Sequence, residues 1–395
     1  MSSSRELLHQ ASFLEEDLRR IRRHIHQNPE LSFHEENTAK FVQNELKKIG
    51  VDSKRIGKTG VVALIGDASK GKCIALRADL DALPIEEANE HVFVSKVKGV
   101  MHACGHDVHS TCLLGAAKLL KKHEAELNGV VKLIFQPGEE RLPGGASILI
   151  KEGVLEHPKV DSIYAMHVFP ELEVGKIGFR EGMYMASCDE LYVAIEGKGA
   201  HGAMPHQGID TVYVSSLFIV EAQSIISRFK NPVEPAVLTF GKINSDGGAT
   251  NVIPQFVHLE GTFRAMNEEF RAQAHEKLKA LAKGMELAHG VKINLKIALG
   301  YPYLHNNEEL TRKAMVTSKR LMGDENVVDL PIRMTAEDFS FYSQKVPACF
   351  FRLGVRNEAK DIVFGVHHPK FDADEDALSI GAANMANLAL EALKA

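Results

Sequence analysis

Apolar side chains recur at helical spacing in the N-terminal part of the chain. Positions 14, 18, 21 and 25 predict one amphipathic helix over residues 5–27, ended by Asn28-Pro29, and a second helix is predicted over 35–49, closed by Gly50. Short apolar runs then predict strands over 61–66, 73–77, 130–135 and 162–168, with a helix over 110–123. Strands that alternate with helices indicate an α/β fold in which helices cover a sheet.

The pattern changes near residue 187. Residues 188–196 alternate apolar and polar, as a strand with one exposed face does. A helix over 211–229, strands over 236–243 and 257–264, a helix over 268–288 and a strand over 291–297 complete the β-α-β-β-α-β order of a ferredoxin-like unit. The α/β pattern resumes with a helix over 307–322 and a strand over 349–353. We therefore expect residues 187–297 to be inserted into a domain formed by 1–186 and 298–395.

Composition narrows the classes of protein. The chain has 395 residues, 45% of them hydrophobic, and its net charge of −5 without a basic stripe argues against nucleic acid as a partner. We find no signal-peptide segment and no apolar run that could cross a bilayer. Five scattered cysteines do not suggest disulfides, so we expect a cytoplasmic protein with reduced thiols.

Residues suited to chemistry gather where predicted strands end. They lie in the segments ADLDALP (78–84), HACGHDVH (102–109), QPGEE (136–140) and AMHVFP (165–170), and GVHHP (365–369) lies near the C-terminus. Because the carboxyl ends of the strands are where ligands bind in α/β sheets, these segments predict one shared site.

The HACGHDVH segment gives the clearest indication of metal binding. Cys104 and His106 lie just before a helix, where the helix N-terminus and a metal both favour a thiolate. Thiolate and imidazole suit zinc or a similar divalent ion. A buried cysteine beside surface histidines is the alternative, but three histidines and an aspartate within eight residues favour ligation.

Two adjacent carboxylates, Glu139 and Glu140, follow a predicted buried strand. Their side chains diverge, so we assign Glu140 as a metal ligand and Glu139 as the general base beside the attacking water. The alternative is a pair of solvated loop carboxylates.

The remaining candidate ligands leave alternatives open. His167 follows a buried strand, where a single histidine is more often structural, and either His367 or His368 could bind a metal. Asp79 and Asp81 could orient ligand histidines through their carboxylates, although their segment could instead be a loop with a helix cap. A catalytic zinc takes about three protein ligands, so five candidates fit two metals that share a bridge.

The predicted inserted domain contains a further cluster. His201 lies in the glycine-rich segment GKGAHGAMPHQGID (197–210) and could stabilise an oxyanion. Arg264 is a natural partner for a substrate carboxylate, and Asn251 lies on the other side of the same predicted strand. Alternatively, Asn251 serves a turn and Arg264 forms a surface ion pair.

In this order the motifs resemble those of a known family. They are HACGHDVH, GEE, MHVFP, GKGAHGAMPHQGID, NVIPQFVHLEGTFR, AEDFSFY and HHPKFDADE, within a resemblance that runs from RRHIHQNPELSF to DEDAL. They resemble the metal-dependent amidohydrolases, which include bacterial N-acyl-amino-acid amidohydrolases (aminoacylases), hippurate hydrolase and plant auxin-conjugate hydrolases. The resemblance implies a zinc-peptidase-like catalytic domain with a central mixed sheet, and an inserted ferredoxin-like lid that forms a homodimer.

The resemblance also assigns roles by position. It makes Glu139 the general base, and it matches His201 to a lid histidine that reaches the partner subunit's active site. Asn251 and Arg264 match residues that hold the substrate carboxylate, whereas Glu337 and Asp338 match a motif whose role the residues do not explain. The implied ligands of two divalent ions, zinc first and manganese, cobalt or nickel as alternatives, are Cys104, His106, Glu140, His167 and His367.

Departures from the family pattern affect the pocket and leave every ligand in place. Arg141-Leu142-Pro143 stands where a glycine-rich run usually follows GEE. Thr211 follows Asp210 in place of proline, His368 stands where serine is common, and Thr335 replaces a glycine. The acyl group and the preferred amino acid are therefore open.

The function predicted is hydrolysis of the amide bond of an N-acetyl or N-benzoyl amino acid. A metallo-dipeptidase or carboxypeptidase of the same chemistry is one alternative. A non-catalytic metal-binding protein is another, although Glu139 and Glu140 argue against it. A thiol hydrolase with Cys104 as nucleophile would keep its activity in the presence of chelators.

Overall fold

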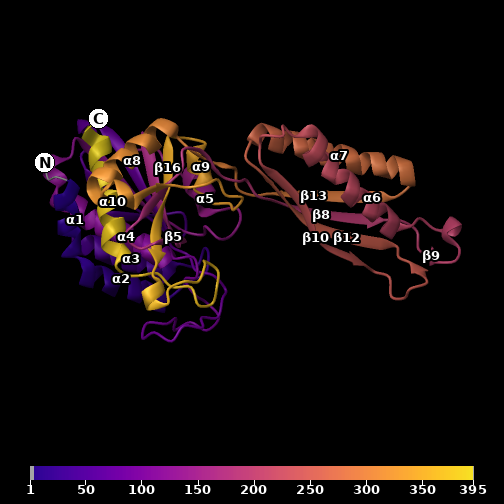
Figure 1. The fold of residues 1–395 in the computed structure, drawn as a ribbon, viewed down its shortest axis with the longest axis horizontal. Coiled ribbons are helices and arrows are strands. Elements are labelled where there is room, and N and C mark those ends of the chain that lie inside the picture. Colours follow the sequence, from indigo (N-terminus) through magenta and orange to yellow (C-terminus); the bar gives the residue numbers. More distant parts are fainter. Residues whose placement is uncertain (1–3, 395) are drawn as a thin grey trace. The chain divides into compact units, whose positions relative to one another are not determined.

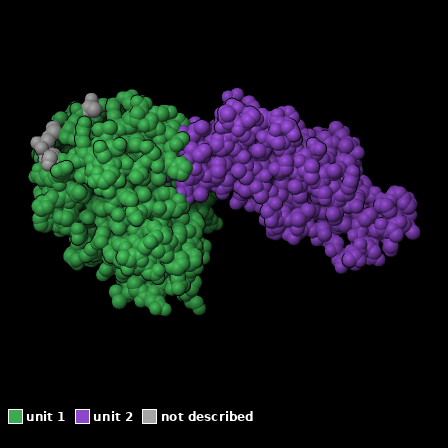
Figure 2. All heavy atoms as spheres, viewed as in Figure 1, with its two compact units in different colours: residues 1–182, 305–331, 338–395 green, residues 183–304, 332–337 purple. Residues whose placement is uncertain are grey.

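The computed structural model describes residues 4–394, which form two compact units. Of the described residues, the first unit contains 4–182, 305–331 and 338–394, and the second contains 183–304 and 332–337 (Figure 2). The sequence-based limits at 187 and 297 lie within the second unit, and the short segment 332–337 joins that unit from a part of the chain expected in the first. Strands β7 (Gly182–Met185) and β14 (Leu304–Asn306) lie where the chain passes between the units.

The first unit is built on a mixed sheet. Its strand order is β1-β2-β4-β3-β5-β16-β6-β15, and the central neighbours β4, β3, β5 and β16 are parallel. The strands are β1 (Ser53–Ile56), β2 (Gly60–Gly66), β3 (Lys72–Asp79), β4 (Gly129–Gln136), β5 (Ser162–Glu173), β6 (Ile177–Phe179), β15 (Val327–Asp329) and β16 (Ala348–Arg356). Almost every residue of β3 and β4 is buried, as expected for parallel strands covered on both faces. The predicted central mixed sheet is confirmed.

Helices cover the sheet of the first unit. Helices α4 (His106–Lys122) and α10 (Ala377–Lys394) pack on one another and on β3 and β5, with α1 (Ser4–Ser12), α2 (Glu15–Gln27), α3 (Glu36–Lys48) and α8 (Glu308–Met322) around them. The short helices α5 (Gly145–Lys151) and α9 (Ser340–Ser343) pack on β4 and β16 (Figure 1). Among the described helices, none has both the length and the hydropathy of a membrane span.

The single helix predicted over residues 5–27 is wrong. The structure has two helices, α1 and α2, which are separated at Phe13 and Leu14. At this break the Ser12 hydroxyl donates to the His9 carbonyl and the Leu14 amide donates to the Ala11 carbonyl. Side-chain bonds of this kind compete with the helical ladder, and a period that continues through the break cannot reveal them.

The second unit has the predicted ferredoxin-like order. Its antiparallel sheet is β10-β12-β8-β13, which places each helical crossover between strands separated by one neighbour. The elements are β8 (Asp189–Glu196), α6 (Thr211–Ser224), β10 (Ala236–Ser245), β12 (Phe256–Ala265), α7 (Glu268–His289) and β13 (Lys292–Leu299). A two-stranded ribbon of β9 (Ala200–His201) and β11 (Val252–Ile253) accompanies the sheet. Asp210 and Asn267 cap α6 and α7 with their side chains.

Candidate active site and metal centre

Three parallel strands and the N-terminus of one helix position the side chains of the site. Strands β3 and β4 end at Asp79 and Gln136, and their neighbour β5 carries His167. Helix α4 begins at His106, one turn before the start that the sequence suggested. Gly105 precedes it with φ of 78°, and a Cβ there would lie 2.5 Å from a Val168 methyl group, so only glycine fits. The glycine thereby allows Cys104 and His106 to approach the end of β5.

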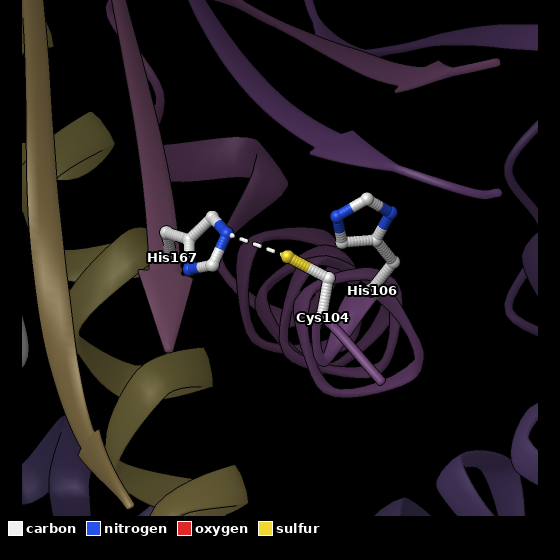
Figure 3. Close-up of side chains that lie close together, drawn as sticks. All are labelled: Cys104, His106 and His167. Carbon is white, nitrogen blue, oxygen red and sulfur yellow. Dashed lines mark hydrogen bonds between the residues drawn. The ribbon is translucent and has the colours of Figure 1, made fainter. Parts of the chain in front are cut away.

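The structure brings all five predicted ligands together. Ligand atoms of Cys104, His106 and His167 lie within 4.8 Å of one another, and so do those of Cys104, Glu140 and His367. Figure 3 shows the Cys104 sulfur directed toward the His167 ring, with Sγ 3.4 Å from Nε2. The His367 Nε2 atom lies 3.3 Å from Oε1 of Glu140. Cys104 belongs to both groups, so its sulfur lies close to each of the other four predicted ligands.

Backbone hydrogen bonds orient the ligand imidazoles. Nδ1 of His106 donates to the Asp81 carbonyl at 2.8 Å, and Nδ1 of His167 donates to the Val168 carbonyl at 2.7 Å. Each ring therefore leaves its Nε2 atom as the one that can bind a metal. Within residues 4–394, the buried Nε2 of His106 and the buried Oε1 of Glu140 have no hydrogen-bond partner. Bound cations would give these two atoms and the nearby thiol the partners that they lack, so these residues are suited to bind metal ions.

His109 lies nearby but serves another purpose. Its Nδ1 is 2.6 Å from Asp79 Oδ1, and its Nε2 accepts a hydrogen bond of 2.8 Å from the Val168 amide. Both ring nitrogens are occupied, so His109 supports the end of β5. Of the two aspartates expected to orient ligands, Asp79 therefore holds His109, and Asp81 holds the ligand His106.

Two buried carboxylates hold the loop of Glu139 and Glu140. Asp81 accepts the Glu139 amide on one oxygen at 3.1 Å and the Glu140 amide on the other at 3.0 Å. Glu35 accepts the Gly138 amide at 2.8 Å and the Thr59 hydroxyl at 2.6 Å. Glu35 was not predicted to belong to the site, because a glutamate at the start of a predicted helix usually faces solvent. Carboxylate oxygens of Glu139 and Glu140 and a ring nitrogen of His106 lie within 4.8 Å of one another, so this fixed loop directs both carboxylates toward the ligand His106.

The charge of the site favours cations. Burial and the neighbouring Glu140 and Glu139 carboxylates raise the pKa of the Cys104 thiol well above its usual range. Burial lowers the pKa of His106, but Asp79, Asp81 and Glu140 outweigh it and raise that pKa to about 10. Burial and nearby His109 lower the pKa of His167, which leaves a neutral imidazole. Divalent ions would supply the positive charge that a thiolate and these carboxylates lack.

A buried network beneath the site gives Asp338 a role that its sequence context did not reveal. Arg77 donates to Asp79 and to Asp338, both at 2.7 Å, and to Gln136 at 3.0 Å. Gln136 also donates to both oxygens of Asp338. The Asp338 amide donates to Oε1 of Glu139 at 3.4 Å. Asp338 thus helps to position the Glu139 carboxylate through its own amide. Glu337 is also buried, but it belongs to the second unit.

The other predicted site residues lie in the second unit. His201 is exposed on β9, and its neighbour Gly202 donates to the Asn251 carbonyl at 2.7 Å. His201 and Asn251 line a shallow depression of about 450 Å³. Arg264 lies near the far end of β12, where it donates to the Met334 carbonyl at 3.1 Å. At about 3.3 Å per residue, the strand separates Arg264 from the Asn251 end by about 25 Å. The strand therefore keeps Asn251 and Arg264 apart within one chain, and their assignment to one substrate carboxylate stays a prediction.

Comparison with known proteins identifies the family. The sequence model of Peptidase family M20/M25/M40 matches residues 75–391, so the chain belongs to this family. It is 42% identical over 369 residues to the N-acetyl-L-cysteine deacetylase of Bacillus subtilis, covering 93% of this chain and 86% of that protein. It is 39% identical over 382 residues to thermostable carboxypeptidase 2 of Saccharolobus solfataricus, covering 96% of each.

A solved structure agrees with the fold. The dinuclear metal-binding M20 peptidase of Bacillus subtilis superimposes with a TM-score of 0.84 at 34% identity, over 97% of this chain and 99% of that one. The predicted α/β fold, the resemblance to metal-dependent amidohydrolases and the prediction of a hydrolase are confirmed.

Proposed function

We propose that this chain hydrolyses the amide bond of N-acyl amino acids at a centre of two divalent ions. The observation that carries the proposal is that Cys104 lies within ligand distance of two groups, one with His106 and His167 and one with Glu140 and His367. The relative that is named a deacetylase of an N-acetyl amino acid and the neighbour that is named dinuclear support the substrate class and the metal count. Thiolate and imidazole ligands favour zinc, with manganese, cobalt and nickel as alternatives.

Each residue has a chemical task in this proposal. Bound ions would acidify a water and polarise the acyl carbonyl. Glu139 takes the proton of the attacking water and passes it to the departing amino group, while Asp81 and Asp338 fix its position. His201 donates a hydrogen bond to the oxyanion. Arg264 and Asn251 bind the carboxylate of the amino acid.

Cys104 itself is a poor nucleophile in this setting. Its side chain is buried, and the carboxylates around it oppose a thiolate unless a cation is bound. This geometry favours the metal hydrolase over the thiol hydrolase. The relationship to a carboxypeptidase keeps peptides as the second candidate substrate class.

The substrate test compares N-acetyl, N-benzoyl and dipeptide substrates with purified, zinc-loaded protein. We expect hydrolysis of N-acyl amino acids, and a kcat/KM at least about 10-fold lower for the matching amino acid amides, because an arginine subsite discriminates against a missing carboxylate. Dialysis against a chelator should remove activity, and zinc or manganese should restore it. Activity that survives metal removal would support the thiol reading, and a preference for dipeptides would support the peptidase reading.

We also propose that the second unit forms a homodimer through α6 and β10. Strand β10 is a sheet edge, and α6 exposes Val212, Tyr213 and Val220, the last at 66%. The separation of Arg264 from the start of β12, which Asn251 precedes, supports this arrangement, since two copies could supply the two groups to one carboxylate.

The dimer is tested by light scattering. Wild-type protein should have twice the 43.5 kDa mass of one chain, and Val220→Lys should give monomers. Leu287→Lys on α7, where Leu287 is 78% exposed, is the matched control and should remain dimeric. A monomeric wild type, or a dimeric Val220→Lys protein, would contradict the interface.

A further inference from the structure

A long irregular segment precedes the metal-binding helix. Residues 80–105, all described, connect β3 to α4 and form isolated bridges but no helix or strand. Segments of this length inside a compact unit need fixed anchoring points or serve a function. Two side chains of this segment, Glu87 and His91, meet His26 at the C-terminal end of α2.

The three side chains have the spacing of metal ligands. Oε1 of Glu87 lies 3.2 Å from Nε2 of His26 and 3.5 Å from Nε2 of His91, and one ligand atom of each residue lies within 4.8 Å of the others. Ligand atoms around a tetrahedral zinc ion, at 2.0–2.1 Å from it, are about 3.3 Å apart. Asp372 offers a fourth oxygen 4.0 Å from Nε2 of His91. None of these residues is a ligand of the proposed catalytic centre.

Neighbouring groups orient the three ligands. Nδ1 of His26 lies 2.9 Å from Asp107, so Nε2 faces Glu87, as in carboxylate–histidine–zinc arrangements. The Ser95 amide donates to the second oxygen of Glu87 at 2.6 Å. Within the described part of the chain, both buried ring nitrogens of His91 lack a hydrogen-bond partner, and burial lowers the pKa of this histidine. A neutral imidazole with an unused lone pair is suited to bind a metal.

The local charge also fits a divalent ion. The Arg22 guanidinium lies 3.2 Å from Asp107 and 2.5 Å from Asp372, whereas the Glu87 carboxylate faces the imidazoles of His26 and His91. Glu375, 3.6 Å from Arg22, is paired with Arg23 at 2.6 Å. Burial lowers the pKa of His26, but Asp107 and Glu87 outweigh it and raise that pKa to about 9, so a divalent ion would displace the Nε2 proton. With that proton lost, three carboxylates and one guanidinium leave two negative charges, which the ion balances.

We propose that His26, Glu87 and His91 form a separate structural site for a divalent cation of the zinc class, with Asp372 or water as the fourth ligand. The ion would tie α2 to the segment 80–105, whose end carries Cys104 and His106. This site holds an ion whether or not the proposed catalytic centre turns over substrate.

The test counts zinc in full-length protein that has been stripped with chelator, given three equivalents of zinc and passed through a desalting column. We expect three zinc ions per chain in the wild type and two in His91→Gln. His123→Gln is the matched control and should keep three, because His123 contacts Glu126 at 3.1 Å but has no second imidazole among its hydrogen-bond partners. In Cys104→Ser, which disturbs the proposed catalytic pair, the ion that His91 holds should remain.

A zinc-edge anomalous map of wild-type crystals provides the second measurement and does not depend on a variant that folds. A peak between the His26 and His91 rings would support the site. Two ions per chain in the wild type, three in His91→Gln, or no anomalous peak at these rings would overturn it. In those outcomes the three side chains form only a charged hydrogen-bonded cluster.

Discussion

Replacement of Glu139 by glutamine is expected to lower kcat about 100- to 10,000-fold while both catalytic ions remain bound. Glutamine has nearly the shape of glutamate but cannot accept the proton of the attacking water. The backbone of residue 139 stays bonded to Asp81, so the loop keeps its path. The measurement pairs kcat on an N-acyl amino acid with zinc content.

The contrasting variant is Glu140→Gln. Glu140 is a proposed ligand, and its unpartnered oxygen lies 3.3 Å from His367 Nε2. This change should reduce zinc content, and higher zinc should restore part of the activity. A Glu139→Gln protein that turns over substrate at the wild-type rate would remove Glu139 as the base. Parallel loss of metal in both variants would make both residues ligands.

The second large effect is expected on stability, from Arg77→Met. The guanidinium is buried and lies between the Asp79 and Asp338 carboxylates, which are themselves fully buried. Removing one partner of a buried ion pair leaves uncompensated charge, which costs about 3–5 kcal/mol of unfolding free energy. Because the chain contains no tryptophan, urea unfolding is best followed by far-UV circular dichroism.

The matched control is Arg55→Met on β1. Arg55 is 30% exposed and lies 3.5 Å from Glu36, so its loss should change stability by at most about 1 kcal/mol. Equal unfolding midpoints for the Arg77 and Arg55 variants would show that the buried network contributes little. Adding Asp338→Asn to Arg77→Met should recover part of the loss, because one stranded charge is removed.

Much of the fold was predictable because the hydrophobic pattern is local. Alternation along 188–196 and the helical spacing over 268–288 are properties of single elements, and both elements form as expected. The break near Ser12 was not predictable, because the helical spacing of apolar residues continues through it. The start of α4 was displaced for a similar reason, since Gly105 and His106 look like loop residues until Val168 fixes their position.

The candidate site was predictable as a set of segments but not as a network. Strand ends indicated that Cys104, Glu140 and His167 would meet, and the structure places them together. Family resemblance was needed to choose His367 over its neighbour. Asp338 and Arg77 are separated by 261 positions, so no local pattern could pair them. For the same reason the sequence could not reveal that Arg264 lies near the end of β12, whereas Asn251 precedes the start of that strand.

The hydrogen bonds that orient His106 and His167 have a consequence for mutational robustness. Both imidazoles donate to main-chain carbonyl oxygens, which every amino acid possesses. The ring orientation of His167 is therefore kept when the Val168 side chain is exchanged, because the bond is to the main chain. The orientation of His26, in contrast, depends on the side-chain carboxylate of Asp107. In laboratory evolution of substrate preference, side chains beside the catalytic ligands can be exchanged with little change in the orientation of the ligand imidazoles, provided that the path of the backbone is preserved.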